Sequence, residues 1–336
     1  MSGFAFQEAP GKVAFRMPPN RTKVVASTAP ATKAEALSEA VNDSAIPSSF
    51  DARQKWPSLI GPVLNQGQCG SCYLFASSEV LMDRMMIALS KPVFGSVSLS
   101  QQFAVNCFSD QGQDPGCNGG VIQDAMQWMS SNPIPQGAPA YTAVQSKCPG
   151  AAQVPKWFGN GPYSVISSSS SSASDQKADM QREIMVNGPV AAAIIVYNDF
   201  QTWWTSSASS GIYKPANTNQ SNIDGGHAIK IIGWGEQDGS PYWLIQNSWG
   251  PTGGIGNSGV YMLYDSTGPE GSGIYTGVVA MHIDSSSAQS QESANAGKIP
   301  YPDPLVDEFL YGKTLYWILG VVVLFVLFAI WWSWKK

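Results

Sequence analysis

The pattern of apolar positions along the chain changes character between its two halves. From Cys72 to about Leu89, apolar residues recur at the three- and four-residue spacing of a mostly buried helix. Asp83 and Arg84 are expected on the solvent-facing side of this helix. Its apolar positions are Leu74, Ala76, Val80, Leu81, Met85 and Ile87.

Four later stretches are short and apolar, and turn-forming residues (Gly, Asn, Asp and Ser) separate them, which is typical of β-strands. They cover residues 189–196, 227–233, 241–247 and 260–264. Helices that come first and strands that come later predict an α+β fold with two subdomains and an antiparallel sheet. The serine-rich run at 167–174 is predicted to be a flexible loop.

The two ends of the chain differ from this middle part. Residues 315–334 carry no charge, and as a helix they would span roughly 30 Å, the thickness of a bilayer core. Aromatic residues flank this run, as they do in membrane-spanning helices. We expect a C-terminal transmembrane anchor at 313–336, with the lipid bilayer as partner, and a polar, proline-containing tether at 285–312.

Residues 1–46 are rich in Ala, Pro, Ser and Thr and contain no apolar run of the kind found in a signal peptide. They are interpreted as an N-terminal arm or a short pro-segment. The globular domain is expected at 47–284. We expect a single-pass membrane protein anchored by its C-terminus, in a compartment that the sequence does not specify.

Composition narrows the functional classes. The 336 residues include 43% apolar and only 13% charged positions, with a net charge of −5. Because there is no basic patch, nucleic acid is not expected as a partner. No cofactor is expected either.

The chain has five cysteines and two histidines, and these limit the catalytic groups and metal ligands that it can offer. Cys69 and Cys72 are three positions apart, but no strand of a redox βαβ unit precedes them, and a zinc site would need a second close ligand pair. The redox and zinc interpretations are therefore disfavoured, and no metal site is expected. Two disulfides and one unpaired thiol remain. Cys72 lies at a helix start, where the helix dipole is expected to lower its thiol pKa.

A thiolate nucleophile needs a base and a group that orients the base. His227 follows two glycines at the start of a strand and is preferred to His282. Asn247 follows another strand and can orient the imidazole, with Trp249 as a shield. The backbone N–H of Cys72 and the side-chain amide of Gln66 are candidate oxyanion donors.

These segments resemble the papain-like cysteine peptidases, and most closely the cathepsin B branch. The likeness spans about residues 47–283, and its motifs are NQGQCGSCYLFA (65–76), GCNGG (116–120), GGHAIKIIGWG (225–235) and PYWLIQNSWG (241–250). It implies a helical left domain, a β-rich right domain and peptide-bond hydrolysis through a thioester acyl-enzyme.

The resemblance also implies a set of residue roles. Cys72 would be the nucleophile, His227 the acid/base, Asn247 the orienting residue and Gln66 an oxyanion donor. The implied disulfides are Cys69–Cys117 and Cys107–Cys148. The implied substrate-binding positions are Gly70, Gly119, Gly120, Gly226, Trp249 and Gly277.

Four departures from the family pattern affect the expectations. Tyr73 stands where the family usually has Trp, and Ile255 lies near the place of a second Trp. No histidine lies between Gly120 and Cys148, where cathepsin B carries a pair that captures a substrate C-terminus, so an endopeptidase is expected. Gly277 takes the place of an acidic specificity residue, which favours an apolar residue at the second position upstream of the cut.

Two questions stay open at this level. Residues 1–46 could occupy the substrate cleft or bind a partner protein. The alternative function is a catalytically weak papain-like scaffold that acts as a structural or binding protein of a membrane or virion. Disulfides are rare in the cytosol, so a viral or endomembrane location is considered for the anchored protein.

Overall fold

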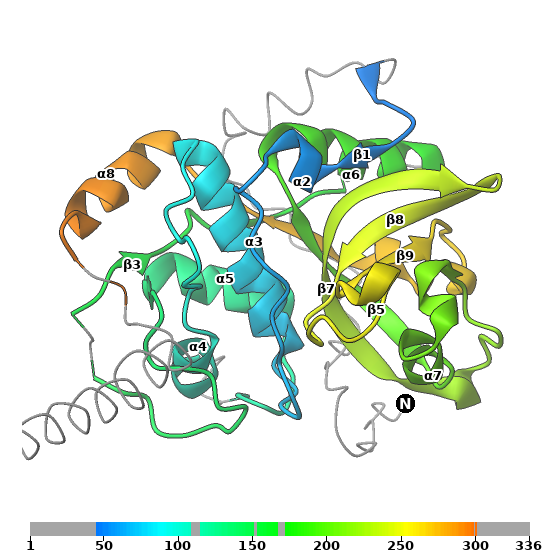
Figure 1. Ribbon diagram of the computed structural model, residues 1–336, viewed down its shortest axis with the longest axis horizontal. Coiled ribbons are helices and arrows are strands. Elements are labelled where there is room, and N and C mark those ends of the chain that lie inside the picture. The colour runs from blue at the N-terminus through cyan, green and yellow to red at the C-terminus, as the bar shows by residue number, and fades with distance from the viewer. Residues whose placement is uncertain (1–44, 109–114, 151–152, 167–171, 299, 301–336) are drawn as a thin grey trace, which may run out of the picture.

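Helices gather on one side of the molecule and a twisted sheet forms the other side (Figure 1). The computed structural model describes residues 45–108, 115–150, 153–166, 172–298 and 300. Within them, the predicted α+β arrangement is confirmed. Residues 1–44 of the predicted arm (1–46) and the predicted membrane span at 313–336 lie outside the described residues.

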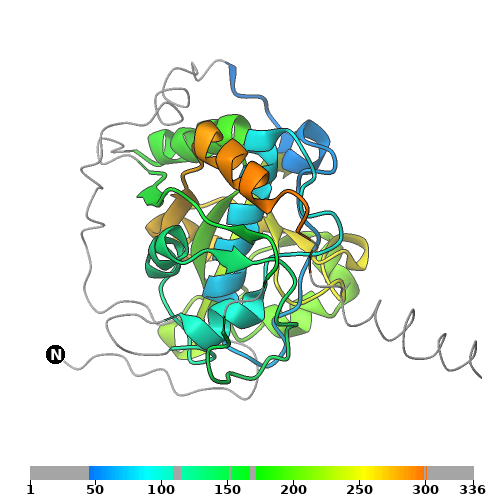
Figure 2. The same ribbon diagram turned by 90° about the vertical axis from the view of Figure 1, so that its left-hand side faces the viewer.

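The helical half is built around α3 (Cys72–Leu89), whose bounds match the predicted helix. Shorter helices surround it (Figure 2), and most of its apolar side chains are buried, whereas Ile87 and Ala88 are partly exposed. Those helices are α4 (Gln101–Cys107), α5 (Ile122–Ser131) and α8 (Ser285–Asn295). The small hairpin β2 (Ile134–Pro135) and β3 (Lys156–Trp157) completes this half.

The sheet contains the four predicted strands at its centre and four more among the described residues. Neighbouring strands are antiparallel except for β6 and β9, and short β1 (Phe50–Asp51) pairs with β7. The spatial order is β4 (Pro162–Ser164), β10 (Val278–Met281), β5 (Val190–Tyr197), β7 (Ile223–Gln237), β8 (Ser240–Gln246), β9 (Val260–Tyr264) and β6 (Ile212–Tyr213). The helices α2 (Ala52–Lys55), α6 (Ala173–Asn187) and α7 (Phe200–Trp204) accompany the sheet.

The expectation that Asp83 and Arg84 face solvent is wrong. Both are buried, because α3 lies between the other helices and the sheet and meets opposite charges there. Asp83 lies 2.7 Å from Lys230 Nζ on β7. The Arg84 guanidinium lies 2.7 Å from the Glu183 carboxylate on α6. A buried charge is tolerated when it is paired and hydrogen-bonded, and these pairs join the two halves.

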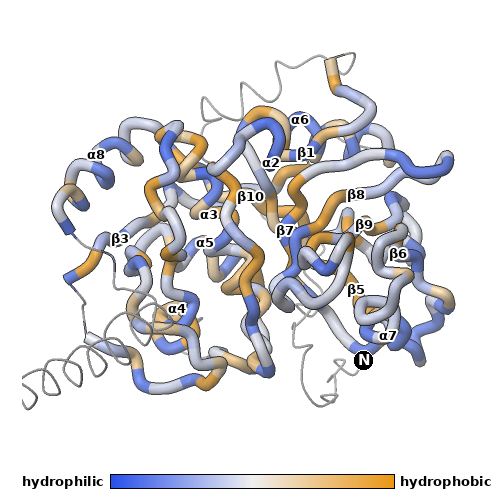
Figure 3. Tube along the Cα trace, viewed as in Figure 1, coloured by the Kyte–Doolittle hydropathy of each residue, from blue (hydrophilic) through white to orange (hydrophobic). Residues whose placement is uncertain are grey.

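The predicted tether also differs from the structure, since its first part folds as α8 against the helical half. Ala288 is fully buried. The Gln291 and Asn295 side chains exchange hydrogen bonds with the backbones of Phe158 and Lys156. The folded domain therefore extends past residue 284 to at least Asn295. Hydropathy did not reveal this, because α8 is largely hydrophilic (Figure 3).

Two further expectations concern flexible or membrane-spanning segments. Residues 167–171 of the predicted serine loop are outside the described part, whereas Ala173 and Ser174 open helix α6. The Ser172 and Asp175 side chains cap that helix reciprocally, which explains why a serine run enters a helix.

Among the described residues, no helix has the length and apolar content needed to cross a bilayer.

Candidate active site

Cys72 begins helix α3 and is fully buried. Both predicted disulfides, Cys69–Cys117 and Cys107–Cys148, are formed. Cys72 is therefore the cysteine left out of a disulfide. The Cys69–Cys117 disulfide fixes the turn just before Cys72. In this turn the Gly70 N–H donates to the Cys117 carbonyl at 2.9 Å.

The Cys72 thiol faces strand β7 next to His227. The backbone at Ala228, the residue after His227, hydrogen-bonds to the thiol. His227 is fully buried, and its Nε2 lies 2.7 Å from Asn247 Oδ1. Thus β7 and the end of β8 place an imidazole and an amide beside the start of α3.

The hydrogen bonds at Asn247 determine the tautomer of His227. The backbone N–H of Ser248 donates to Asn247 Oδ1 at 2.9 Å, which identifies that atom as the oxygen. His227 Nε2 must then carry the proton and donate to the same oxygen. Nδ1 keeps its lone pair and has no hydrogen-bond partner among the described residues. This is the atom that can accept a proton from a thiol.

His282, the other histidine, follows β10 and lies at a different place in the sheet. Its backbone pairs with Asn160 and Gly161. Strand β5 separates β10 from β7. The Asn247 contact therefore belongs to His227, the histidine that the sequence favoured.

Burial controls the ionisation of both groups. It raises the pKa of the Cys72 thiol to about 11, although backbone hydrogen bonds oppose the shift. It lowers the pKa of His227 to about 4, against the effect of Asn247. The predicted lowering of the thiol pKa is therefore wrong for this state, because desolvation outweighs the helix start. Burial penalises either charge alone, whereas proton transfer from thiol to imidazole creates two charges that stabilise each other.

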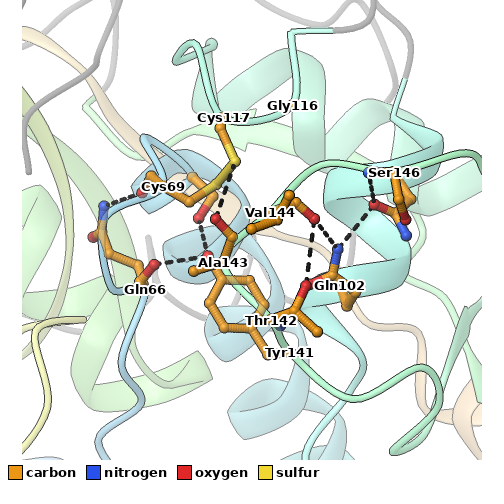
Figure 4. The surroundings of a disulfide bond; sticks show 12 residues. Gln66, Cys69, Gln102, Gly116, Cys117, Tyr141, Thr142, Ala143, Val144 and Ser146 are labelled. Carbon is orange, nitrogen blue, oxygen red and sulfur yellow. Dashed lines mark hydrogen bonds between the residues drawn. A yellow bond between two sulfur atoms is a disulfide. The ribbon is translucent and has the colours of Figure 1, made fainter. Parts of the chain in front are cut away.

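Gln66 is fully buried and lies beside the Cys69–Cys117 disulfide (Figure 4). Its backbone N–H donates to the Ser248 carbonyl at 2.8 Å, and its Oε1 accepts from the Ser248 hydroxyl at 2.6 Å. Its Nε2 donates to the Cys69 carbonyl at 2.9 Å. The predicted oxyanion donor is thus held beside the residue that follows Asn247.

The predicted substrate-binding glycines occupy distinct backbone environments. Gly119 has a positive φ of 82°, which favours glycine. A Cβ on Gly120 would lie 2.5 Å from the Tyr73 ring, whereas a Cβ on Gly277 would meet only Ala193, at 3.9 Å. Gly226 lies in β7 opposite Ile195 of β5. Contacts of these glycines with substrate stay a prediction.

Aromatic residues surround the histidine. The Trp249 ring lies 4.9 Å from that of His227, and Trp204 of α7 packs edge-on against Trp249 at 5.9 Å. The Trp204 indole fills the space next to Gly253, where a Cβ would lie 2.4 Å away. Ile255 instead packs partly buried in a separate apolar cluster. Trp204 was missed in the sequence, where the only signal was the aromatic pair in FQTWW.

Tyr73, the other departure from the family pattern, is fully buried in the helical half. Its hydroxyl donates to the Gly116 carbonyl at 3.1 Å, and its ring packs 5.7 Å from Phe108. It thus fastens the segment next to Cys117 to the helix of the nucleophile. Among the described residues, no cluster of His, Cys, Asp and Glu side chains forms a metal site.

The comparisons with known proteins agree with this geometry. The family model described as papain family cysteine protease matches residues 46–281. The chain therefore belongs to the papain family of cysteine proteases and is a cysteine-type peptidase.

Curated relatives place the chain near cathepsin B-like proteinases. A gut-specific cysteine proteinase of Caenorhabditis elegans is 34% identical over 261 residues, which cover 70% of this chain and 73% of the relative. A cathepsin B-like cysteine proteinase of Schistosoma japonicum is 33% identical, over 61% of this chain and 65% of its own.

Solved structures share the fold. Procathepsin B S9 from Trypanosoma congolense superposes with a TM-score of 0.59 at 22% identity, covering 74% of this chain and 80% of its own. Digestive procathepsin L 3 from the larval midgut of Tenebrio molitor gives 0.58 at 25% identity, over 82% and 76%. These likenesses support the papain-like α+β fold.

Proposed function

We propose that the chain is a cysteine endopeptidase in which Cys72 Sγ attacks the carbonyl carbon of a peptide bond. His227 Nδ1 takes the thiol proton and then gives it to the leaving amine, which yields a thioester on Cys72. Water, deprotonated by the same imidazole, cleaves the thioester and releases the acid. Asn247 orients the imidazole, and the Gln66 amide and the Cys72 N–H stabilise the oxyanion.

The observation that carries this proposal is the junction of α3 and β7. A thiol that belongs to neither disulfide, at the first residue of α3, meets the strand of His227. The Nε2 of this histidine is bonded to Asn247, and its Nδ1 accepts no hydrogen bond from the part of the chain that the structure describes. Each group has the partner that its role requires. The scaffold function, which would need no such tautomer, is not favoured.

The two histidines provide a matched test. We expect hydrolysis of a fluorogenic peptide to fall by at least about 100-fold in His227→Ala, the scale of general acid–base catalysis. His282→Ala should keep near-normal activity because it lies beyond strand β5. Equal losses in the two variants, or no loss in His227→Ala, would contradict the assignment.

We propose endopeptidase rather than peptidyl-dipeptidase activity, since the segment from Gly120 to Cys148 contains no histidine. The test is one peptide with either a free or an amidated C-terminus. Similar cleavage rates at internal bonds are expected. A strong preference for the free acid with release of dipeptides would refute this.

The specificity proposal is an apolar preference at the second residue upstream of the cut. It is supported by Gly277, where a Cβ would make only an ordinary contact with the apolar Ala193 side chain, at 3.9 Å. In a peptide library, the wild-type chain should prefer apolar residues there, and Gly277→Glu should shift the preference toward Arg. A wild-type preference for Arg would contradict it.

The two chain ends complete the proposal. Residues 1–46 are proposed to inhibit the enzyme until they are cut off, in line with the procathepsin neighbours. A chain that starts at Ile46 should be more active than the full chain; equal rates would oppose inhibition.

Residues 313–336 are proposed to anchor the chain in a bilayer. The full chain should float with lipid vesicles in a density gradient, whereas a chain ending at residue 312 should not. Flotation of both, or of neither, would contradict the anchor.

A further inference from the structure

The Tyr141 hydroxyl joins two segments of the candidate active site that the motifs treat separately (Figure 4). It donates to the backbone carbonyl of Gln66 at 2.8 Å. It also lies 2.8 Å from the Ser71 hydroxyl. Because the single phenolic proton goes to Gln66, the Ser71 hydroxyl is the donor in the second bond. Tyr141 thus bridges the residue that carries one proposed oxyanion donor and the residue just before the nucleophile.

The Ser71 bond is made at the expense of a helix cap. Ser71 is the N-cap residue of α3, and a serine there normally accepts a hydrogen bond from the second or third N–H of the helix. Its side chain makes no such bond here. The hydroxyl is buried and directed to Tyr141 instead. The Ser71 hydroxyl therefore ties the start of α3 to Tyr141 and does not cap the N–H groups of the helix.

The bridge fixes both oxyanion donors relative to each other. One is the Cys72 N–H, directly after Ser71, and the other is the Gln66 side chain. Ser248 holds the Gln66 N–H and Oε1, and Tyr141 holds the Gln66 carbonyl. The Cys69 carbonyl gives a second link, because it accepts from Gln66 Nε2 at 2.9 Å and from the Ser71 N–H at 2.8 Å. Oxyanion stabilisation depends on donors placed within a few tenths of an ångström.

The tyrosine is itself held in place as a donor. Its ring packs edge-on against Phe75 of α3, with centroids 4.9 Å apart. Burial raises the pKa of the Tyr141 phenol to about 12, so the phenol stays protonated over the working range of a peptidase. The ring contact and the two hydrogen bonds leave the hydroxyl one orientation.

We propose that Tyr141 is a positioning residue that aligns the oxyanion donors of Gln66 and Cys72 without altering the nucleophilicity of the thiol. This inference rests on the proposed function. It implies that loss of the hydroxyl affects steps that develop an oxyanion and spares direct alkylation of the thiol, which forms no oxyanion.

The experiment compares Tyr141→Phe with a matched control, Tyr242→Phe. The Tyr242 hydroxyl lies beside Gly235, at the end of β7 remote from His227. Both variants lose one hydroxyl and keep the ring. For each, kcat and KM on a fluorogenic peptide, affinity for a peptide aldehyde and the rate of Cys72 alkylation by iodoacetamide are measured. The aldehyde adds to the thiol and leaves an oxygen at the oxyanion position.

For Tyr141→Phe we expect kcat to fall by about 10-fold, less than the 10²–10³-fold that follows loss of a whole oxyanion donor. KM and the alkylation rate should stay within about twofold of wild type, and aldehyde affinity should fall in parallel with kcat. Tyr242→Phe should match wild type in all four measurements.

Unchanged kcat in Tyr141→Phe would overturn the inference. So would an equal loss in alkylation rate, which would indicate a general disturbance of the nucleophile, or an equal effect in Tyr242→Phe. A wild-type chain that hydrolyses no peptide would instead overturn the proposed function, and this inference with it.

Discussion

The junction between α3 and β7 has two layers that are held together by different chemistry. The layer around Cys72 and His227 is built from neutral groups, namely the amides of Gln66 and Asn247 and hydroxyls. About two helical turns further along α3, the second layer is ionic, with Lys230 between Glu79 and Asp83. The three ionic side chains are almost completely buried.

This difference indicates two separate tasks. The neutral layer positions the reacting groups, and the ionic layer holds the two halves of the molecule together. Neutral hydrogen bonds fix atoms at the reacting end and bring no additional formal charge to the thiol and imidazole. The ionic layer joins the helical half to the sheet and would be costly to break, because an unpaired charge would stay buried. Changes in the neutral layer should therefore alter kcat in a folded protein, and changes in the ionic layer should alter stability first.

The largest effect on this comparison is expected from Lys230→Met. It removes the cation and leaves Asp83 and Glu79 buried together, so the free energy of unfolding should fall by about 3–5 kcal/mol. Urea unfolding measures this. Lys91→Met is the control, because its ion pair with Glu292 is solvent-exposed and should be worth less than about 1 kcal/mol. Similar losses in the two variants would remove the distinction between the layers.

Asn247→Ala tests the neutral layer. The imidazole loses its orienting acceptor, and we expect kcat/KM to fall by about 100-fold. The urea midpoint should move far less than in Lys230→Met. Because the Asn247 contact raises the pKa of His227, the acidic limb of the pH–kcat/KM profile should also move to lower pH in the variant. A limb that moves to higher pH would count against the proposed role.

The third and smallest effect is a pH dependence of stability that originates in the ionic layer. Burial raises the pKa of Glu79 from its ordinary value of 4.5 to about 7. The native state therefore keeps a proton that the unfolded state releases. The stabilising contribution is complete below about pH 4.5 and is lost as the pH rises to about 7.

Urea unfolding at several pH values tests this loss. The stability of wild type relative to Glu79→Gln should decrease over that range and stay constant above it. A relative stability that rises with pH would contradict the predicted direction of this pH dependence.

The sequence predicted more of the elements than of the contacts between them. The bounds of α3 and the positions of β5, β7, β8 and β9 follow from apolar spacing, and the resemblance supplied the disulfides. Burial of Asp83 and Arg84 could not be predicted, because their partners lie more than 90 residues away in the chain. A charged residue with no visible partner is reasonably placed in solvent.

The same reason explains what was missed around the site. Helix α8 is polar and docks through Gln291 and Asn295, whose backbone partners lie far away in sequence. Trp204 and Tyr141 reach the site from segments outside the motifs. Motifs near the reacting groups revealed the chemistry, whereas the side chains that hold those groups are dispersed along the chain.

The most direct test of the central claim is covalent labelling with an epoxide-type, thiol-directed peptide inhibitor. The mass of the intact protein and of its peptides is measured in wild type, His227→Ala and Cys72→Ala. We expect one adduct, on Cys72, formed rapidly in wild type, much more slowly in His227→Ala and not at all in Cys72→Ala. An adduct that persists in Cys72→Ala, or labelling that does not depend on His227, would contradict the assignment of the Cys72–His227 pair.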